Sequence, residues 1–438
     1  MAEINQLVKE RTERTQWFLQ DRFGMFIHWG LYAIPARGEW VRSHEKLSND
    51  DYQKYFDAFD PVDYDPRAWA KAAKNAGMKY AVMTAKHHDG FCLFDSKLTD
   101  YKATNTKAGR DLVREYLDAF RAEGLKVGLY YSLIDWHHDN YPAFGDRMHP
   151  MRENEAYKDP GRDAKKYADY LHGQVKELLT NYGKLDIMWF DFSYDNMAGE
   201  TWKATELVKM IRSLQPHVII DNRLDHGGEL SFGGSIQSQN PSFISGDFAS
   251  PEQVIPPEGL VDEEGKSIPW EACVTLNRSW GYNEFDDMYK SPKLIIRKLV
   301  ECVSKNGNML VNVGPDAKGR IPKASLDILN RIGEWIAANK DSIYGCGISD
   351  YEKPEWGRYT QKGNKLYAHL FDENIGPYNL KGLNGKAKSA CFLNNGTEVF
   401  LVPSWIDKND VFLTFGKPFY KYFPLSDDID TVIEVDLG

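Results

Sequence analysis

Cysteine is scarce in this chain of 438 residues. The five cysteines are Cys92, Cys273, Cys302, Cys346 and Cys391. Their number is odd, they are scattered, and no pair has CxxC spacing, so the sequence predicts neither a disulfide framework nor a cysteine zinc site. We expect them to be small, buried hydrophobic residues.

The chain also lacks a long apolar run and an excess of basic residues. No stretch of about 18 apolar residues occurs, and the charged beginning, MAEINQLVKERTERTQWF, has no apolar core of a signal peptide. We therefore expect no membrane partner and a cytoplasmic protein, or a periplasmic or secreted one if an export signal was removed. The formal net charge of -10 disfavours nucleic acid as a partner, because binding phosphates requires a basic surface.

Short apolar runs alternate with segments of helical period up to about residue 340, which is typical of βα units around a parallel sheet. The predicted strands are Gly24–Gly30, Lys79–Ala85, Lys126–Ser132, Lys184–Asp191, His217–Arg223, Trp270–Leu276 and Asn308–Gly314. A weaker run at Ser245–Ala249 would complete a closed barrel, whose strands are buried on both faces. The predicted fold class is therefore α/β, a (β/α)8-like (TIM) barrel.

The pattern changes after Ile343 to alternating strands separated by Gly and Asn turns, among them KLYAHLF, DVFLTF and TVIEVDL. This pattern is typical of a β-sandwich. The chain is also longer than one hydrophobic core usually serves. The predicted domains are therefore the barrel, residues 1–344, and a C-terminal β-sandwich domain, residues 345–438.

Polar residues follow several predicted strands at the point where each strand ends. His28 lies near the end of FGMFIHWG, His87 and His88 follow the second strand, Asp191 closes KLDIMWFD, and Arg223 ends the fifth strand. In (β/α)8 barrels the active site lies at these carboxyl ends. We therefore expect these side chains to converge on one mouth and to include catalytic groups.

A metal site is the alternative interpretation of the histidines. Neighbouring side chains on a strand point to opposite faces, so His87 and His88 are not expected to share one ion. The sequence has no HxH or HExxH motif. We therefore expect no metal and no cofactor.

Asp191 is a candidate catalytic residue, because a carboxylate that ends an apolar run is costly to bury without a partner or a function. The alternative is a structural aspartate that caps the next helix, a role that Asp195 could also fill. Arg223 could neutralise Asp191. Retaining glycosidases place a second carboxyl about 5 to 5.5 Å from the nucleophile. The candidates for that second carboxyl are Glu252 in DFASPEQ and Glu271 in WEACVTL, and their spacing does not decide between them.

Eight strings occur in order along the predicted barrel: FGMFIHWG, TAKHHDGFCLF, GLYYSLIDW, MWFD, DNR, PEQ, WEACVTLNRSWGYN and NGNMLVNVGPDAKGRIP. In this order they resemble glycoside hydrolase family 29, the α-L-fucosidases, over residues 20 to about 345. The resemblance implies a retaining exo-α-L-fucosidase that removes terminal fucose from oligosaccharides or glycoconjugates by double displacement.

The resemblance also implies roles for individual residues. The family's nucleophile falls on Asp191. Its acid/base falls on Glu252 in the broad-specificity branch and nearer Glu271 in the branch restricted to blood-group-type structures, and the WGYN string favours Glu252. In that case Glu271 is expected to hold Arg or His groups of the sugar pocket. The implied fucose-binding residues are His28, Glu39, Trp40, His87, His88, Tyr130, Trp189 and Arg223, with Trp280 as an apolar wall for the methyl group.

Two other functions stay open. A catalytically silent, lectin-like protein would bind fucose without cleaving it, although the presence of Asp191 and Glu252 argues against this. A related retaining glycosidase with another sugar preference would differ in one contact to a small substituent, which is worth about 1 to 3 kcal/mol.

Overall fold

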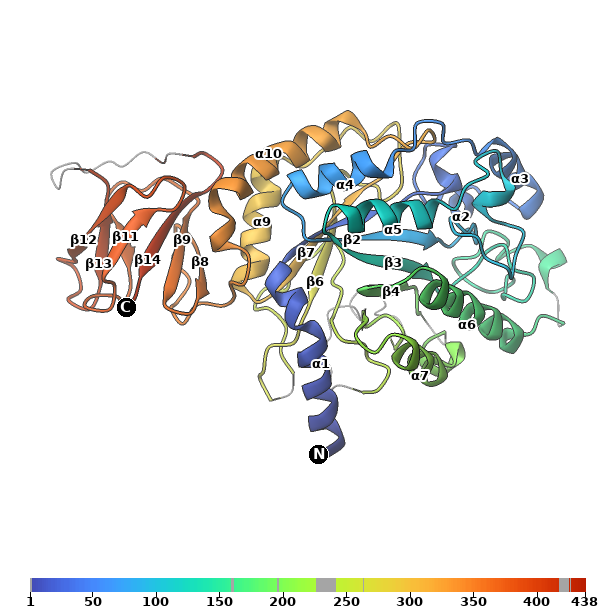
Figure 1. Ribbon diagram of the computed structural model, residues 1–438, viewed down its shortest axis with the longest axis horizontal. Coiled ribbons are helices and arrows are strands. Elements are labelled where there is room, and N and C mark those ends of the chain that lie inside the picture. Colours follow the sequence, from blue (N-terminus) through green and yellow to red (C-terminus); the bar gives the residue numbers. More distant parts are fainter. Residues whose placement is uncertain are drawn as a thin grey trace.

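A curled parallel sheet with surrounding helices is followed by an antiparallel sheet at the carboxyl end of the chain (Figure 1). The computed structural model describes residues 2–158, 161–194, 197–225, 242–262, 264–416, 425 and 427–438. All five cysteines lie within these residues and are free; four are buried and Cys391 is half-buried.

The parallel sheet has the order β5-β4-β3-β2-β1-β7-β6. Its strands are β1 (Phe23–Ile27), β2 (Tyr80–Lys86), β3 (Lys126–Ser132), β4 (Ile187–Asp191), β5 (Ile219–Ile220), β6 (Glu271–Thr275) and β7 (Asn308–Val313). Nearly every strand residue is buried, as expected for a sheet covered on both faces. The predicted α/β class is confirmed, and each of the seven strands lies at its predicted place.

The predicted eighth strand is not a regular strand. In its place, residues 247–253 form isolated parallel bridges, to β5 through Asp221 and Phe248 and to β6 through Glu252 and Cys273. Pro251 within this segment has no N–H to donate, which limits regular pairing. The segment nevertheless lies between β5 and β6, the two edges of the curled sheet, and joins them.

The described helices are α1 (Ala2–Asp21), α2 (Val41–His44), α3 (Asn49–Ala58), α4 (Pro66–Asn75), α5 (Leu112–Ala122), α6 (Ala164–Asn181), α7 (Ala204–Leu214), α9 (Pro292–Ser304) and α10 (Lys323–Asn339). Short 3-10 helices are η1 (Leu31–Ala33), η2 (Ala103–Asn105), η3 (Glu155–Tyr157), η4 (Gly199–Trp202) and η5 (Lys340–Ser342). Local sequence sets their starts: Asp65 accepts from Arg67 N and Ala68 N ahead of α4, which begins with a proline. Within the described chain, no helix is long and apolar enough to span a membrane.

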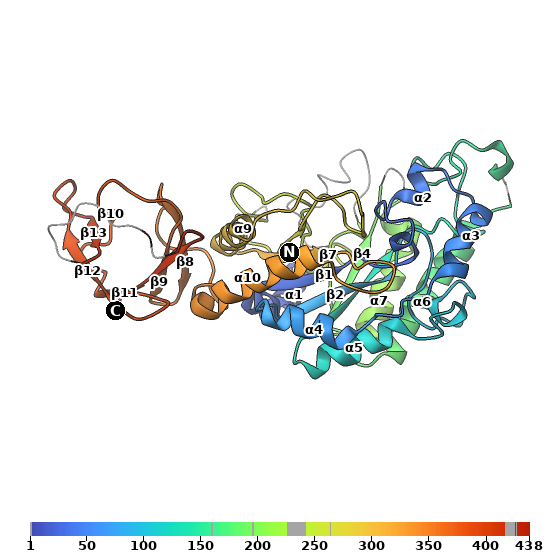
Figure 2. The same ribbon diagram turned by 90° about the horizontal axis from the view of Figure 1, so that it is seen from above.

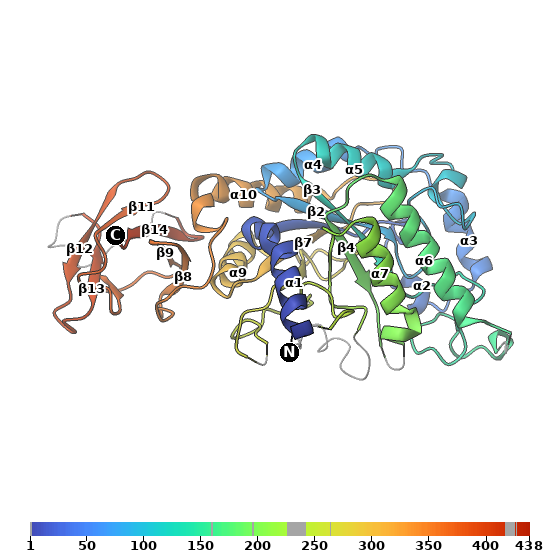
Figure 3. The same cartoon turned by 60° about the horizontal axis from the view of Figure 1, so that its bottom comes forward.

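Helix α1 covers the amino end of the sheet. Its Phe18 packs against Tyr80 at the start of β2 and against Phe248, with ring centroids 5.6 and 4.9 Å apart. The buried Asp247 accepts hydrogen bonds from Arg14 of α1 at 2.9 Å and from Arg212 of α7 at 2.6 Å. These contacts place α1 and α7 on the same side of the sheet (Figure 3) and leave the carboxyl ends of the strands for the site.

The antiparallel sheet has the order β10-β13-β12-β11-β14-β9-β8. Its strands are β8 (Gly357–Lys362), β9 (Lys365–Leu370), β10 (Tyr378–Leu380), β11 (Ser389–Phe392), β12 (Glu398–Pro403), β13 (Val411–Thr414) and β14 (Thr431–Asp436). Strand β12 pairs first with β11 and then with β13, so it joins two halves of the sheet around a separate apolar core.

Helices α9 and α10 lie between the two sheets (Figure 2). Trp335 of α10 donates to Asp430 O at 3.0 Å, and Arg358 of β8 pairs with Glu301 of α9 at 2.9 Å. Tyr367, Ile429 and Val432 of the carboxyl-terminal region pack in the core of the parallel-sheet part, so the two parts share apolar contacts. The division at residue 344/345 stays a prediction.

Candidate active site

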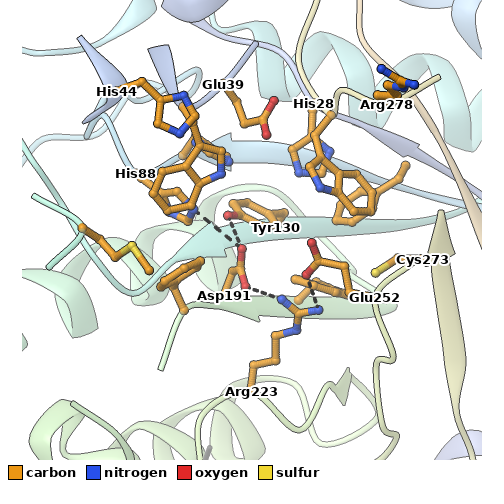
Figure 4. A pocket seen from close by; sticks show the side chains of 17 residues that line it. His28, Glu39, His44, His88, Tyr130, Asp191, Arg223, Glu252, Cys273 and Arg278 are labelled. Carbon is orange, nitrogen blue, oxygen red and sulfur yellow. Dashed lines mark hydrogen bonds and ion pairs between the residues drawn. The ribbon is translucent and has the colours of Figure 1, made fainter. Parts of the chain in front are cut away.

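A pocket of about 390 Å³ lies at the carboxyl ends of the parallel strands (Figure 4). It is lined by Phe26, His28, Glu39, Trp40, His44, His87, His88, Tyr130, Met148, Trp189, Asp191, Phe192, Arg223, Glu252, Cys273, Arg278 and Trp280. The set includes every sequence-predicted site residue except Glu271. Parallel strands end at the same edge of a sheet, which is why residues far apart in the chain meet here.

Asp191, Arg223 and Glu252 form the charged floor of the pocket. Arg223 Nη1 donates to Asp191 Oδ1 at 2.6 Å, and Nη2 donates to Glu252 Oε2 at 3.0 Å (Figure 4). Tyr130 OH donates to the other oxygen of Asp191, Oδ2, at 2.7 Å. One guanidinium group therefore contacts both carboxylates and keeps them in the same part of the pocket.

The guanidinium group of Arg223 is itself fixed. Its Nε donates to Ser250 Oγ at 3.0 Å, and the group lies 4.5 Å from the ring centroid of Trp189. Burial lowers the pKa of Arg223, but the charges of Asp191 and Glu252 outweigh burial and raise it. Arg223 is therefore a permanent cation that both carboxylates share.

His28 and His88 are neutral acceptors in the pocket. Burial lowers the pKa of His28 to about 4 and that of His88 to about 3. His28 Nδ1 lies 2.7 Å from Asn312 Oδ1, and His88 Nδ1 lies 2.7 Å from Ser132 Oγ. Because the Ser132 hydroxyl already donates to a backbone oxygen, His88 Nδ1 must be the donor. The Nε2 atom of His88 is then an acceptor, 3.9 Å from Asp191 Oδ2.

The expectation that His87 and His88 point to opposite faces is wrong. Their ring centroids are 4.0 Å apart, and both rings line the pocket. The reason is that β2 ends at Lys86 after a register shift, so strand alternation no longer applies to the two histidines. Among the residues that the structure describes, no three His, Cys, Asp or Glu side chains are placed to hold a metal ion.

Glu39 and Trp40 enter the pocket from the loop before α2. Glu39 is buried, and its Oε2 accepts from Gly281 N at 2.8 Å. Burial, with the nearby charge of Glu252, raises the pKa of Glu39 to about 7. The Trp40 ring packs against His88, with centroids 5.0 Å apart, and Trp280 packs against His28 at 5.1 Å. Aromatic faces therefore flank the carboxylates, as sugar pockets require.

Glu271 lies outside the pocket. It begins β6, two residues before Cys273 on the same face of the strand, and therefore lies one side-chain layer toward the amino ends. Its Oε2 accepts from Tyr80 OH, and burial raises the pKa of Glu271 to about 8. The expectation that Glu271 holds Arg or His groups of the sugar pocket is therefore wrong, because its partner is a buried tyrosine.

Six lining residues were not predicted from the sequence: Phe26, His44, Met148, Phe192, Cys273 and Arg278. Two carried a usable signal. Phe26 lies two positions before His28 and so on the same face of the strand, and His44 lies one helical turn after Trp40. Met148 and Arg278 come from loops, where no periodicity indicates which way a side chain points.

Comparison with known proteins gives one consistent result. The model of the family described as Alpha-L-fucosidase matches residues 2–341. The chain is 30% identical to an alpha-L-fucosidase of Dictyostelium discoideum, covering 81% of this chain and 77% of that protein. It is 28% identical to the human tissue alpha-L-fucosidase, covering 80% and 74%.

Solved structures agree with these relatives. The alpha-L-fucosidase isoenzyme 1 of Paenibacillus thiaminolyticus is 63% identical, with a TM-score of 0.93 over 98% of this chain and 100% of that chain. A Bacteroides thetaiotaomicron alpha-L-fucosidase variant, trapped as a covalent intermediate in complex with 2-fluoro-fucosyl fluoride, is 28% identical. It has a TM-score of 0.80, over 97% and 96% of the two chains.

Proposed function

The chain belongs to the alpha-L-fucosidase family and is a retaining glycoside hydrolase, and we propose that Asp191 is its nucleophile and Glu252 its general acid/base. The single observation that carries this assignment is the Arg223 guanidinium group, which contacts both carboxylates within one pocket. Glu271, the other candidate acid, does not line this pocket.

In the first step, an oxygen of Asp191 attacks the anomeric carbon of the sugar. The bond from that carbon to the leaving oxygen breaks, and Glu252 gives its proton to the leaving oxygen. Asp191 becomes a neutral ester in this step, while Glu252 becomes a carboxylate. Arg223 can then pair with the carboxylate of Glu252, so the total charge of the floor stays constant.

In the second step, Glu252 takes a proton from water, and the water oxygen attacks the anomeric carbon. The bond to Asp191 breaks, which restores the Asp191 carboxylate and the protonated Glu252. Two displacements at the same carbon return the original configuration, as a retaining mechanism requires.

The substrate is proposed to be a fucosylated oligosaccharide or glycoconjugate with fucose at its end. The neutral His28 and His88 accept hydrogen bonds from sugar hydroxyls, and Glu39 can accept or donate because its pKa is near neutrality. Trp189 and Trp280 supply apolar faces for the ring and its methyl group. A pocket of about 390 Å³ suits one sugar residue with its leaving group at the mouth.

Trapping the glycosyl-enzyme tests the assignment. We expect 2-fluoro-fucosyl fluoride to label the enzyme once, and mass spectrometry of the digest to find the label on Asp191. Proton NMR of early hydrolysis of an aryl α-L-fucoside should show α-fucose before mutarotation. A label on any other carboxylate would refute the role of Asp191. Separately, activity on a panel of natural fucosylated oligosaccharides would define the preferred leaving group.

A further inference from the structure

The segment that carries Glu252 forms a backbone ladder with β6 that begins with a hydrogen bond from Glu271 N to Ala249 O at 2.9 Å and ends at Gln253. Cys273 N donates to Pro251 O at 3.0 Å, and Gln253 N donates to Cys273 O at 2.9 Å. Beyond this point the Gln253 side chain continues the ladder. Its Nε2 donates to Thr275 Oγ1 at 2.9 Å, and its Oε1 accepts from Thr275 N at 3.3 Å.

Thr275 is held in turn by Lys290. The ammonium group of Lys290 donates to Thr275 O at 2.7 Å, to Thr275 Oγ1 at 3.1 Å and to Asn277 O at 2.6 Å. The Thr275 hydroxyl donates its one hydrogen to Asn277 O at 2.6 Å, which leaves it as the acceptor for Gln253 and Lys290. Thr275 is fully buried, so this network has one arrangement in which every partner is satisfied.

The residues that follow Glu252 are loosely packed. A cavity of about 290 Å³ lies behind it, lined by Gln253, Val254, Ile255, Val274, Lys290, Leu294, Ile295, Lys298, Glu301 and Met309. Val254 is 42% exposed. The backbone of Gln253 has φ of 55°, a left-handed conformation that residues other than glycine adopt at a cost. The hydrogen bonds of the Gln253 side chain therefore offset both the strain and the missing contacts.

We propose that Gln253, Thr275 and Lys290 are positioning residues for Glu252, an inference that rests on the proposed acid/base role of Glu252. A general acid works only within hydrogen-bond reach of the leaving oxygen. When the Gln253 side chain is lost, the adjacent Glu252 moves away from that reach. Asp191 keeps its own contacts to Tyr130 and Arg223, so nucleophilic attack is retained.

A series of aryl α-L-fucosides with phenols of increasing pKa tests the proposal. We expect Gln253→Ala to leave kcat/KM nearly unchanged for the most acidic phenol, which departs without a proton. For phenols of high pKa we expect a loss of about tenfold or more, because general acid catalysis is worth roughly 10²- to 10⁴-fold. A loss by the same factor for every phenol, or no loss, would overturn the proposal.

Three further variants sharpen the test. Val254→Ala removes an apolar side chain from the same loop and cavity, and we expect it to match the unmodified enzyme across the whole series. Thr275→Val and Lys290→Met remove hydrogen bonds while keeping side-chain bulk, and we expect the same dependence on phenol pKa as for Gln253→Ala. Thermal unfolding of each variant shows whether the protein is folded. If Lys290→Met is folded and its kcat/KM depends on phenol pKa as that of the unmodified enzyme does, Lys290 is not a positioning residue.

Glu252→Ala, measured in the same series, separates the two proposals. Suppose that kcat/KM of Glu252→Ala falls steeply with phenol pKa and azide restores its activity, while Gln253→Ala loses kcat/KM by the same factor for every phenol. In that case only the positioning role fails. If the loss of kcat/KM in Glu252→Ala does not depend on phenol pKa and azide does not restore activity, the acid/base assignment fails, and the positioning role fails with it.

Discussion

Glu252 and Glu271 are two glutamates of one barrel with opposite surroundings. Glu252 lies at the pocket, is partly exposed, and contacts a cation, Arg223. Glu271 lies one layer deeper and is fully buried, and among the described residues the hydroxyl of Tyr80 is the hydrogen-bond partner of its carboxyl group. The carboxyl of Glu252 thus has a cationic partner at the pocket, whereas burial favours the neutral form of Glu271. Access and partner, more than residue type, therefore distinguish the proposed acid/base Glu252 from the buried Glu271.

The largest expected loss of activity comes from replacing Asp191, which shares the pocket with Glu252. Asp191→Ala should lower kcat/KM roughly 10⁴-fold or more, because loss of a nucleophile removes the covalent route. The fold should persist, since Arg223 keeps Glu252 as a partner. Steady-state kinetics and thermal unfolding check both points. A folded variant with near-normal turnover would remove Asp191 from the mechanism.

Glu252→Ala should have the next largest effect. We expect a loss of roughly 10²- to 10⁴-fold on natural fucosides, which need a proton donor. An activated aryl fucoside should still form the fucosyl-enzyme and let it accumulate, which lowers the apparent KM. Azide needs no base and should restore turnover by attacking the fucosyl-enzyme from the face opposite Asp191, giving an α-fucosyl azide.

Glu271→Ala is the matched comparison for that experiment. It should show no azide rescue and no accumulation of the fucosyl-enzyme. Rescue of Glu271→Ala but not of Glu252→Ala would exchange the two roles.

Glu271→Gln should change stability more than activity. Burial raises the pKa of Glu271 to about 8, above the ordinary value of a glutamate, so the folded protein holds this proton more tightly than the unfolded chain. That stabilisation is complete below a pH of about 4.3 and is lost as pH rises toward 8. Gln stays neutral, so the stability of the variant relative to the unmodified protein should rise by on the order of 3 kcal/mol from pH 5 to pH 8.

Urea unfolding of both proteins at the two pH values measures this difference. Parallel changes in the two unfolding free energies would show that Glu271 is already ionised in the folded protein.

Chelation should have the smallest effect, namely none. The proposed mechanism uses two carboxylates and no metal ion, so an excess of chelator should leave kcat/KM unchanged. Loss of activity that returns on adding a divalent cation would make the neighbouring His28, His87 and His88 candidates for a metal site.

The sequence predicted the framework of the barrel well where hydrophobicity is continuous. The third strand was expected at Lys126–Ser132 and has those bounds. The fifth was expected at His217–Arg223, but only Ile219–Ile220 pairs regularly, because the carboxylate of Asp221 accepts the hydrogen bond of Phe190 N instead. Where side chains take the place of backbone hydrogen bonds, the pattern of apolar residues does not show it. For the same reason the sequence could not predict how the segment around Glu252 pairs with its neighbours.

What the sequence determined by itself is the class of fold, the family and the strand that ends in Asp191. Runs of buried strand residues, capping residues and ordered motifs are local signals, and local signals survive in a linear string. Only the tertiary structure placed Glu252 at the pocket and Glu271 outside it, and only it brought His87 and His88 to one side. Those outcomes depend on where strand alternation stops and on which chain segments become neighbours when the sheet curls. Both are set by packing across the barrel, between residues that are far apart in the chain.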